Sequence, residues 1–146
     1  MRTKRVNRYY CEFCRKSGGS AGHMVRHEEH CTMNPHRKCR MCESIDTPQP
    51  DIRSLLSALP NAETFEVPAQ FGIGKAYRGL DDGIRAGIER CKSITECPIC
   101  IFAALRQSGL IHFTDTGVFD LKAEMAKTWQ AINDADARAE MDSYHY

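Results

Sequence analysis

The chain has 146 residues, eight of them cysteines, which suits one compact domain or two small modules and excludes a large enzyme. We expect a cytoplasmic protein with reduced cysteines and no membrane contact, because no apolar run follows the basic start and the longest apolar stretch, 99–105, is far below the roughly 20 residues of a membrane span. The formal net charge of +1 is uneven, since ten Lys and Arg against three Glu give residues 1–42 a charge of +7 and leave −6 for the remainder.

The first metal-binding pattern begins with the motif Cys11-Glu-Phe-Cys14. Twelve residues separate Cys14 from His27, and three separate His27 from Cys31. This spacing is typical of a zinc finger, in which a turn supplies two thiolates and a helix supplies two more ligands one turn apart. We therefore predict a zinc ion bound by Cys11, Cys14, His27 and Cys31.

Neighbouring histidines fit the spacing less well. A pair made by His23 and His27 leaves too few residues after Cys14 for a turn and a helix. A pair made by His27 and His30 leaves Cys31 unused, so we expect His30 to face solvent. The string HEEH also lacks two histidines four positions apart, which a helical metalloprotease motif requires, so we expect no enzyme activity.

Residues 9–31 resemble the two-cysteine two-histidine zinc finger family, with cysteine as the last ligand. Met24 matches the family's core leucine, but Gly18 stands where the family has its core aromatic residue. The resemblance implies a shallow finger core, which we expect Tyr9, Tyr10 or Phe13 to support.

The resemblance also implies a helix that begins near Ser20 and places Ser20, His23 and Arg26 at the positions that contact bases. Together with the basic charge, it predicts a nucleic-acid surface made of Arg2, Lys4, Arg5, Arg15, Lys16, Ser20, His23 and Arg26. One finger covers only about three base pairs, so we expect non-specific, salt-sensitive binding. Glu28 and Glu29 would repel phosphates. Two other interpretations stay open: the finger binds a protein, or the two oppositely charged halves attract each other.

A second metal site is predicted from two further CxxC motifs, Cys39-Arg-Met-Cys42 and Cys97-Pro-Ile-Cys100, which are 54 residues apart. Four thiolates make a closed structural zinc site with no position for a substrate. A crossed grouping stays open, in which Cys11 and Cys14 join Cys39 and Cys42, and His27 and Cys31 join Cys97 and Cys100. Cys91 is left over on an apolar stripe, and we expect it to be buried.

The elements beyond the first module are predicted from proline, glycine and apolar spacing. Segment 46–50 is a linker with two prolines, and 51–59 is a short helix that ends before Pro60. A strand at 65–67 and a loop at 71–74 follow. Apolar residues at intervals of three and four predict a helix over 77–91.

A stripe of glycines and two further helices are predicted in the helical part. Gly79, Gly83 and Gly87 recur every fourth residue, which indicates either close approach by another helix or a frayed segment. Pro98 opens a helix over 98–108 that Gly109 ends. The last helix is predicted over 119–140, with Trp129 on its inner face and therefore in the core.

The order CxxC, HEEHCTMNP, KCRMC, CPICIFAALRQSG and FDLKAEM resembles a group of small zinc-finger proteins encoded by bacteriophages and prophages, of unestablished function. The resemblance implies expression in the cytoplasm of an infected bacterium.

We expect a small mixed α+β fold, mainly α, with a zinc-finger module (1–45) joined through the four-cysteine site to a helical domain (46–146). Our hypothesis is a non-enzymatic accessory protein with two zinc ions that binds nucleic acid. The alternative is an adaptor that binds a host or virion protein, and the oligomeric state is left undetermined.

Overall fold

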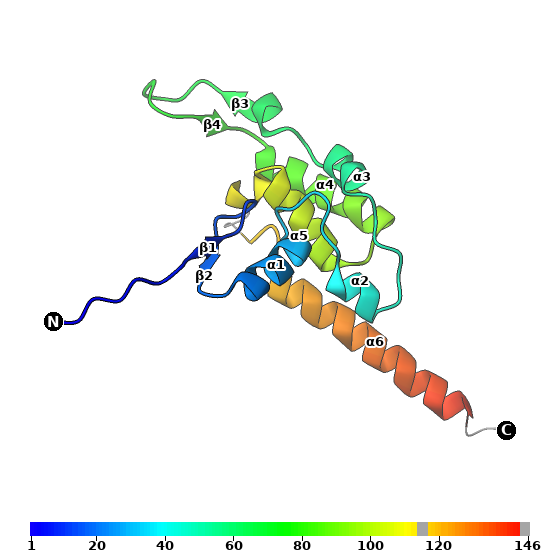
Figure 1. Cartoon of the computed structure of the whole chain (residues 1–146). Coiled ribbons are helices and arrows are strands. Elements are labelled where there is room, and N and C mark those ends of the chain that lie inside the picture. The colour runs from blue at the N-terminus through cyan, green and yellow to red at the C-terminus, as the bar shows by residue number, and fades with distance from the viewer. Residues whose placement is uncertain (114–116, 144–146) are drawn as a thin grey trace.

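The structure is a computed structural model that describes residues 1–113 and 117–143. As predicted, it is a small mixed α+β fold that is mainly helical, with two short antiparallel hairpins. Figure 1 shows a helical body from which three segments project: the N-terminal arm, the hairpin between β3 (Glu66–Val67) and β4 (Ala76–Tyr77), and the distal part of helix α6 (Leu121–Ser143).

The N-terminal part has the order expected of a finger. Strands β1 (Tyr9–Tyr10) and β2 (Ser17–Gly18) pair, and helix α1 (Ala21–His30) follows. Ser20 is the N-cap of α1, because its hydroxyl accepts a hydrogen bond from the backbone N–H of His23. The helix therefore begins where the sequence predicted.

The small core of the finger contains Met24, as predicted, packed with Cys11 and Cys31. The aromatic support predicted for it is wrong: Tyr9, Tyr10 and Phe13 are all exposed. Two methionines, Met24 and Met33, fill the core of the finger instead. Met33 packs against the cluster, and Met24 Cε would lie 3.5 Å from a Cβ atom added to Gly18, so Met24 fills the space beside Gly18.

The main core is formed by three helices: α3 (Ile52–Ala58), α4 (Leu80–Ile94) and α5 (Pro98–Gln107). The predicted helices at 51–59 and 98–108 and the loop at 71–74 are confirmed. Gly109 follows α5 with a φ of 77°, a conformation that glycine adopts without strain. The core also includes Met41 and Cys42 of the short helix α2 (Arg40–Ser44) and its N-cap Cys39, so residues of the predicted first module pack into it.

The predicted start of the helix over 77–91 is wrong by three residues. Tyr77 belongs to β4, where it pairs with Glu66, and its ring packs edge-to-face on Phe113 at 5.0 Å. Helix α4 starts at Leu80, after Gly79 with a φ of 73°. The strand predicted over 65–67 is confirmed for Glu66 and Val67, which form β3, whereas Phe65 ends the preceding 3-10 helix η1 (Ala62–Phe65).

The glycines of α4 face a closely packed segment. A Cβ atom added to Gly83 would lie 2.6 Å from the Phe65 ring, and one added to Gly87 would lie 2.8 Å from Pro60 Cδ. The close approach predicted for the glycine stripe is therefore present. The contacts come from the last residue of α3 and from the segment that follows it, since the Ala58 carbonyl would lie 3.3 Å from the Gly87 Cβ atom and Phe65 belongs to the short helix η1.

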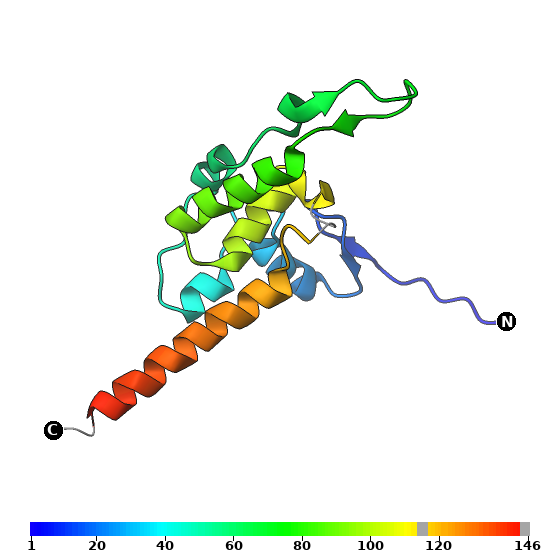
Figure 2. The same cartoon turned by 180° about the vertical axis from the view of Figure 1, so that it is seen from behind.

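Helix α6 contacts the body mainly through its first turns, where Met125 packs against the core. The remainder extends away from the body as a rod (Figures 1 and 2). Trp129 is 40% exposed, so its predicted core position is wrong. The short 3-10 helix η2 (Leu110–Phe113) follows α5. Among the described helices, none is long and apolar enough to cross a membrane.

Candidate metal centres

Two groups of side chains bring their ligand atoms within 4.8 Å of one another, so each could hold a metal ion. The first contains Cys11, Cys14, His27 and Cys31, and the second contains Cys39, Cys42, Cys97 and Cys100. This is the sequential grouping; the crossed grouping does not occur. Within residues 1–113 and 117–143, these are the clusters of three or more such ligands.

The first centre is built by the β1–β2 turn and the end of α1. The turn is closed by a hydrogen bond of 2.8 Å from the Cys11 N–H to the Lys16 carbonyl, with Arg15 at a φ of 61°. The Phe13 N–H points at Cys11 Sγ at 3.4 Å. His27 lies in the last turn of α1, and Cys31 is its C-cap, so both side chains face the turn.

The two half-buried ligands of this centre, Cys14 and His27, lie close together. Cys14 Sγ lies 3.1 Å from His27 Nε2. Burial would raise the pKa of the Cys14 thiol, but hydrogen bonds from the Lys16 backbone and from His27 outweigh it and lower that pKa to about 7. Burial raises the pKa of Cys31 to about 11. Cys14 is therefore the more readily ionised of these two thiols, and a bound cation would favour the thiolate of Cys31.

The second centre is buried where two helices begin. Cys39 is the N-cap of α2 and Cys97 is the N-cap of α5, so Cys42 and Cys100 lie in the first turns of those helices. Pro98 at the first position of α5 loses no hydrogen bond there. Because helix N-termini favour negative charge, both helices stabilise thiolates at this point.

Distances in the second centre exclude disulfides. The Sγ atoms of Cys39 and Cys97 are 3.6 Å apart, as are those of Cys42 and Cys100, whereas a disulfide is about 2.05 Å long. Hydrogen bonds from Cys100 and Cys97 hold the pKa of Cys39 well below its usual range, and burial raises that of Cys42 to about 12. Cys39 is therefore a thiolate, and a bound divalent cation would balance its negative charge.

Two residues that the sequence did not single out enclose this centre. Arg37 is buried, and its Nη1 lies 3.7 Å from Cys100 Sγ. Gln49, from the linker, accepts a hydrogen bond of 2.6 Å from the Cys39 N–H and donates one of 2.8 Å to the Arg37 carbonyl. The linker therefore fixes the backbone around the first CxxC motif.

The two centres are tied together by the end of α5. Arg106 donates a hydrogen bond of 2.6 Å to the Thr32 hydroxyl, and Gln107 donates to the carbonyls of Thr32 and Asn34. Buried Asn34 in turn donates to the Glu28 carbonyl at 2.8 Å. These bonds anchor the segment after α1 to the helical body.

Other residues near α1 have structural contacts. The prediction that His30 faces solvent is wrong: it is 22% exposed, and its Nδ1 lies 2.9 Å from the Lys38 carbonyl. Glu28 accepts a hydrogen bond of 2.9 Å from the Glu12 N–H, and Glu29 pairs with Lys38. Cys91 is fully buried as expected, with its thiol 3.6 Å from the Leu55 carbonyl.

The predicted nucleic-acid residues are all exposed. Arg2, Lys4 and Arg5 lie on the extended N-terminal arm (Figure 1). Arg15 and Lys16 lie in the turn of the finger, and Ser20, His23 and Arg26 lie on α1 or at its start. The Ser20 hydroxyl is engaged as the helix cap, so its role at the helix start is structural.

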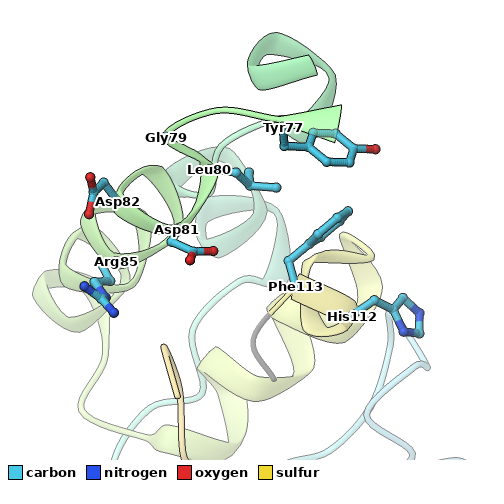
Figure 3. Close-up of a pocket in the computed structure, with 8 residues that line it drawn as sticks. All are labelled: Tyr77, Gly79, Leu80, Asp81, Asp82, Arg85, His112 and Phe113. Atoms are coloured by element: carbon cyan, nitrogen blue, oxygen red, sulfur yellow. The ribbon is translucent and has the colours of Figure 1, made fainter. Parts of the chain in front are cut away.

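A hollow of about 560 Å³ lies around the start of α4 and beside η2 (Figure 3). Its lining includes Asp81, Asp82, Arg85, Tyr77, His112 and Phe113. In Figure 3 Asp81 points toward Phe113, whereas Asp82 and His112 point in opposite directions, away from these two residues. Its charges are mixed, and its carboxylates and His112 do not converge on one point.

Comparison of the chain with models of known protein families found no match, and searches of curated proteins and of solved structures found no similar protein. The function is therefore inferred from the geometry of the two centres and their surroundings.

Proposed function

We propose that the chain is a non-enzymatic protein with two structural zinc ions. The observation that carries this proposal is the convergence of two complete ligand sets, one with three cysteines and a histidine and one with four cysteines. Zinc prefers tetrahedral sites with these donors, and a Zn–S bond of about 2.3 Å places neighbouring sulfurs about 3.8 Å apart. The observed 3.6 Å fits that spacing.

The ligand count supports the non-enzymatic part of the proposal. Each centre offers four protein ligands, so a tetrahedral ion has no position for water or a substrate. In this role zinc supplies folding free energy, on the order of 10 kcal/mol for each ion. Dialysis against a strong chelator should unfold the protein, and zinc should restore it. A protein that keeps its helical circular-dichroism spectrum without metal would contradict the structural role.

We further propose that the basic N-terminal part binds nucleic acid. The charge of +7 on residues 1–42 and the exposure of the predicted basic side chains support it. Binding that releases counterions weakens as salt rises, with a slope that counts the phosphates contacted. Affinity for duplex and single-stranded oligonucleotides should therefore fall steeply between about 50 and 200 mM salt. Salt-independent affinity would overturn this function.

A second candidate is a protein adaptor, and one observation favours it. Half-exposed Trp129 lies beside a mostly apolar hollow of about 330 Å³ that Met41, Ile99 and Met125 also line. Exposed apolar hollows of this kind suit a partner's side chain. Replacing Trp129 with Ala should then abolish capture of a specific protein and leave oligonucleotide binding unchanged.

The resemblance to phage zinc-finger proteins supports a role in the cytoplasm of an infected bacterium, and this setting is part of the proposal. A tagged chain that carries Trp129→Ala and is expressed during phage infection should still recover nucleic acid from the lysate. If the original chain instead recovers a protein, also after nuclease treatment, and the Trp129→Ala variant does not, the result would favour the adaptor.

A further inference from the structure

A hollow of about 560 Å³ lies where the finger meets the helical body. The turn of the finger, α1, α2 and α5 all contribute to its lining, through Lys16, His23, Arg26, His30, Arg40 and Arg106. It therefore spans residues 16–106 of the sequence, and the Arg106–Thr32 hydrogen bond lies at its edge.

The charged side chains that line this hollow are all positive. Four of its lining residues are Lys or Arg, and none of the described residues that line it is Asp or Glu. The side chains of Lys16, Arg26 and Arg40 make no hydrogen bond or ion pair with another residue in the described part of the chain. The carboxylate of Glu29 interacts electrostatically with His30 and Arg40, but its ion pair is made with Lys38. The positive charge in the hollow is therefore left for a ligand.

One of the cations is already oriented. The guanidinium of Arg106 donates to the neutral Thr32 hydroxyl at 2.6 Å and lies 5.9 Å from the centre of the Phe102 ring. Neither contact neutralises its charge. A guanidinium held in this way loses less conformational entropy when it binds a phosphate.

Aromatic side chains beside the hollow favour nucleic acid over an acidic peptide. Strand β2 contributes Ser17 and Gly18 to the lining, and β1, which pairs with it, exposes Tyr10 (64%) and Tyr9 (38%). The basic N-terminal arm leads into the same strand (Figure 2). Exposed aromatic rings that alternate with cations can stack on bases while the cations bind the backbone.

We propose that this hollow binds the phosphate backbone of a nucleic acid, with Arg26, Arg40 and Arg106 as its main contacts. This inference rests on the proposed nucleic-acid function and specifies its surface: the strand passes through the joint between the two metal centres. It differs from a finger that acts alone, because α2 and α5 supply two of the three arginines.

The test compares two double variants of the zinc-loaded full chain. Arg26→Gln with Arg40→Gln removes two exposed cations from the hollow, and Arg53→Gln with Arg85→Gln removes two exposed cations from α3 and α4. The net charge changes equally in both. Zinc content and thermal unfolding of both should match the original chain, because all four side chains are exposed.

Fluorescence anisotropy with a labelled 20-nucleotide oligonucleotide, single-stranded and duplex, gives affinity against salt. The hollow variant should bind at least tenfold more weakly, and its log–log salt slope should fall by about two, one for each lost phosphate contact. The control should change less than about threefold. Equal effects of the two variants would overturn the inference while leaving nucleic-acid binding in place. Absence of binding by the original chain, or binding of polyglutamate in preference to the oligonucleotide, would overturn both.

Discussion

The buried Arg37 guanidinium lies 3.7 Å from Cys100 Sγ, although the two residues are 63 positions apart in the sequence. Burial opposes a charged guanidinium, but the thiol groups of Cys39 and Cys100 outweigh that effect and raise the pKa of Arg37. Four thiolates outweigh the charge of one divalent ion, so Arg37 supplies part of the missing positive charge.

Replacing Arg37 with Leu should therefore weaken zinc binding at the second centre. Loss of a residue that hydrogen-bonds to a metal ligand typically costs about 10–100-fold in affinity. Competition with a chromophoric chelator measures this for the two zinc ions in turn. Arg37→Lys should recover part of the affinity, because it keeps the charge. Exposed Arg53→Leu is the control, and an equal loss in that variant would exclude the specific contact.

Alanine substitutions of Cys31 and of His30 show which of these neighbours is the zinc ligand. Cys31→Ala should remove one zinc ion per chain and unfold the finger, because a closed site loses a ligand. His30→Ala should keep both ions. Its cost should be about 1 kcal/mol, since it loses the contact with the Lys38 carbonyl. Zinc content and thermal unfolding measure both effects, and zinc loss in the His30 variant alone would reverse the assignment.

Glycine substitutions probe the packing of α4. Gly87→Ala should destabilise the protein by about 1–3 kcal/mol, because the new methyl group would meet Pro60 and the Ala58 carbonyl. Gly83→Ala should cost less, since the Phe65 ring that it meets is a side chain that can shift. Gly22→Ala in α1 is the matched control with open space, and it should stabilise by up to about 1 kcal/mol. Denaturant unfolding at fixed zinc measures all three, and a stabilised Gly87 variant would refute the packing argument.

The sequence predicted the features that depend on local spacing. Intervals between Cys14, His27 and Cys31 specify a turn and one face of a helix, and the structure brings those residues together. Proline and glycine marked the ends of α3 and α5 for the same local reason. The three CxxC motifs and the pair His27 and Cys31 could be grouped in more than one way, because spacing alone says little about a pairing across 54 residues.

Features that depend on distant contacts were missed. Arg37 and Gln49 look like ordinary polar surface residues until α5 is placed against them. Trp129 follows an apolar helical spacing, but α6 passes the edge of the body, so the helix leaves its partner before that residue is covered. Tyr77 matched the helical spacing of α4, and pairing with Glu66 draws it into a strand instead.

The grouping of ligands into two zinc centres is tested most directly by counting the zinc ions that two double variants retain. Cys11→Ser with Cys31→Ser removes two ligands from one centre, and Cys11→Ser with Cys39→Ser removes one from each. After dialysis against a chelator of moderate affinity, elemental analysis should give two zinc ions for the original chain, one for the first variant and none for the second. One ion in the second variant and none in the first would show the crossed grouping and contradict the account.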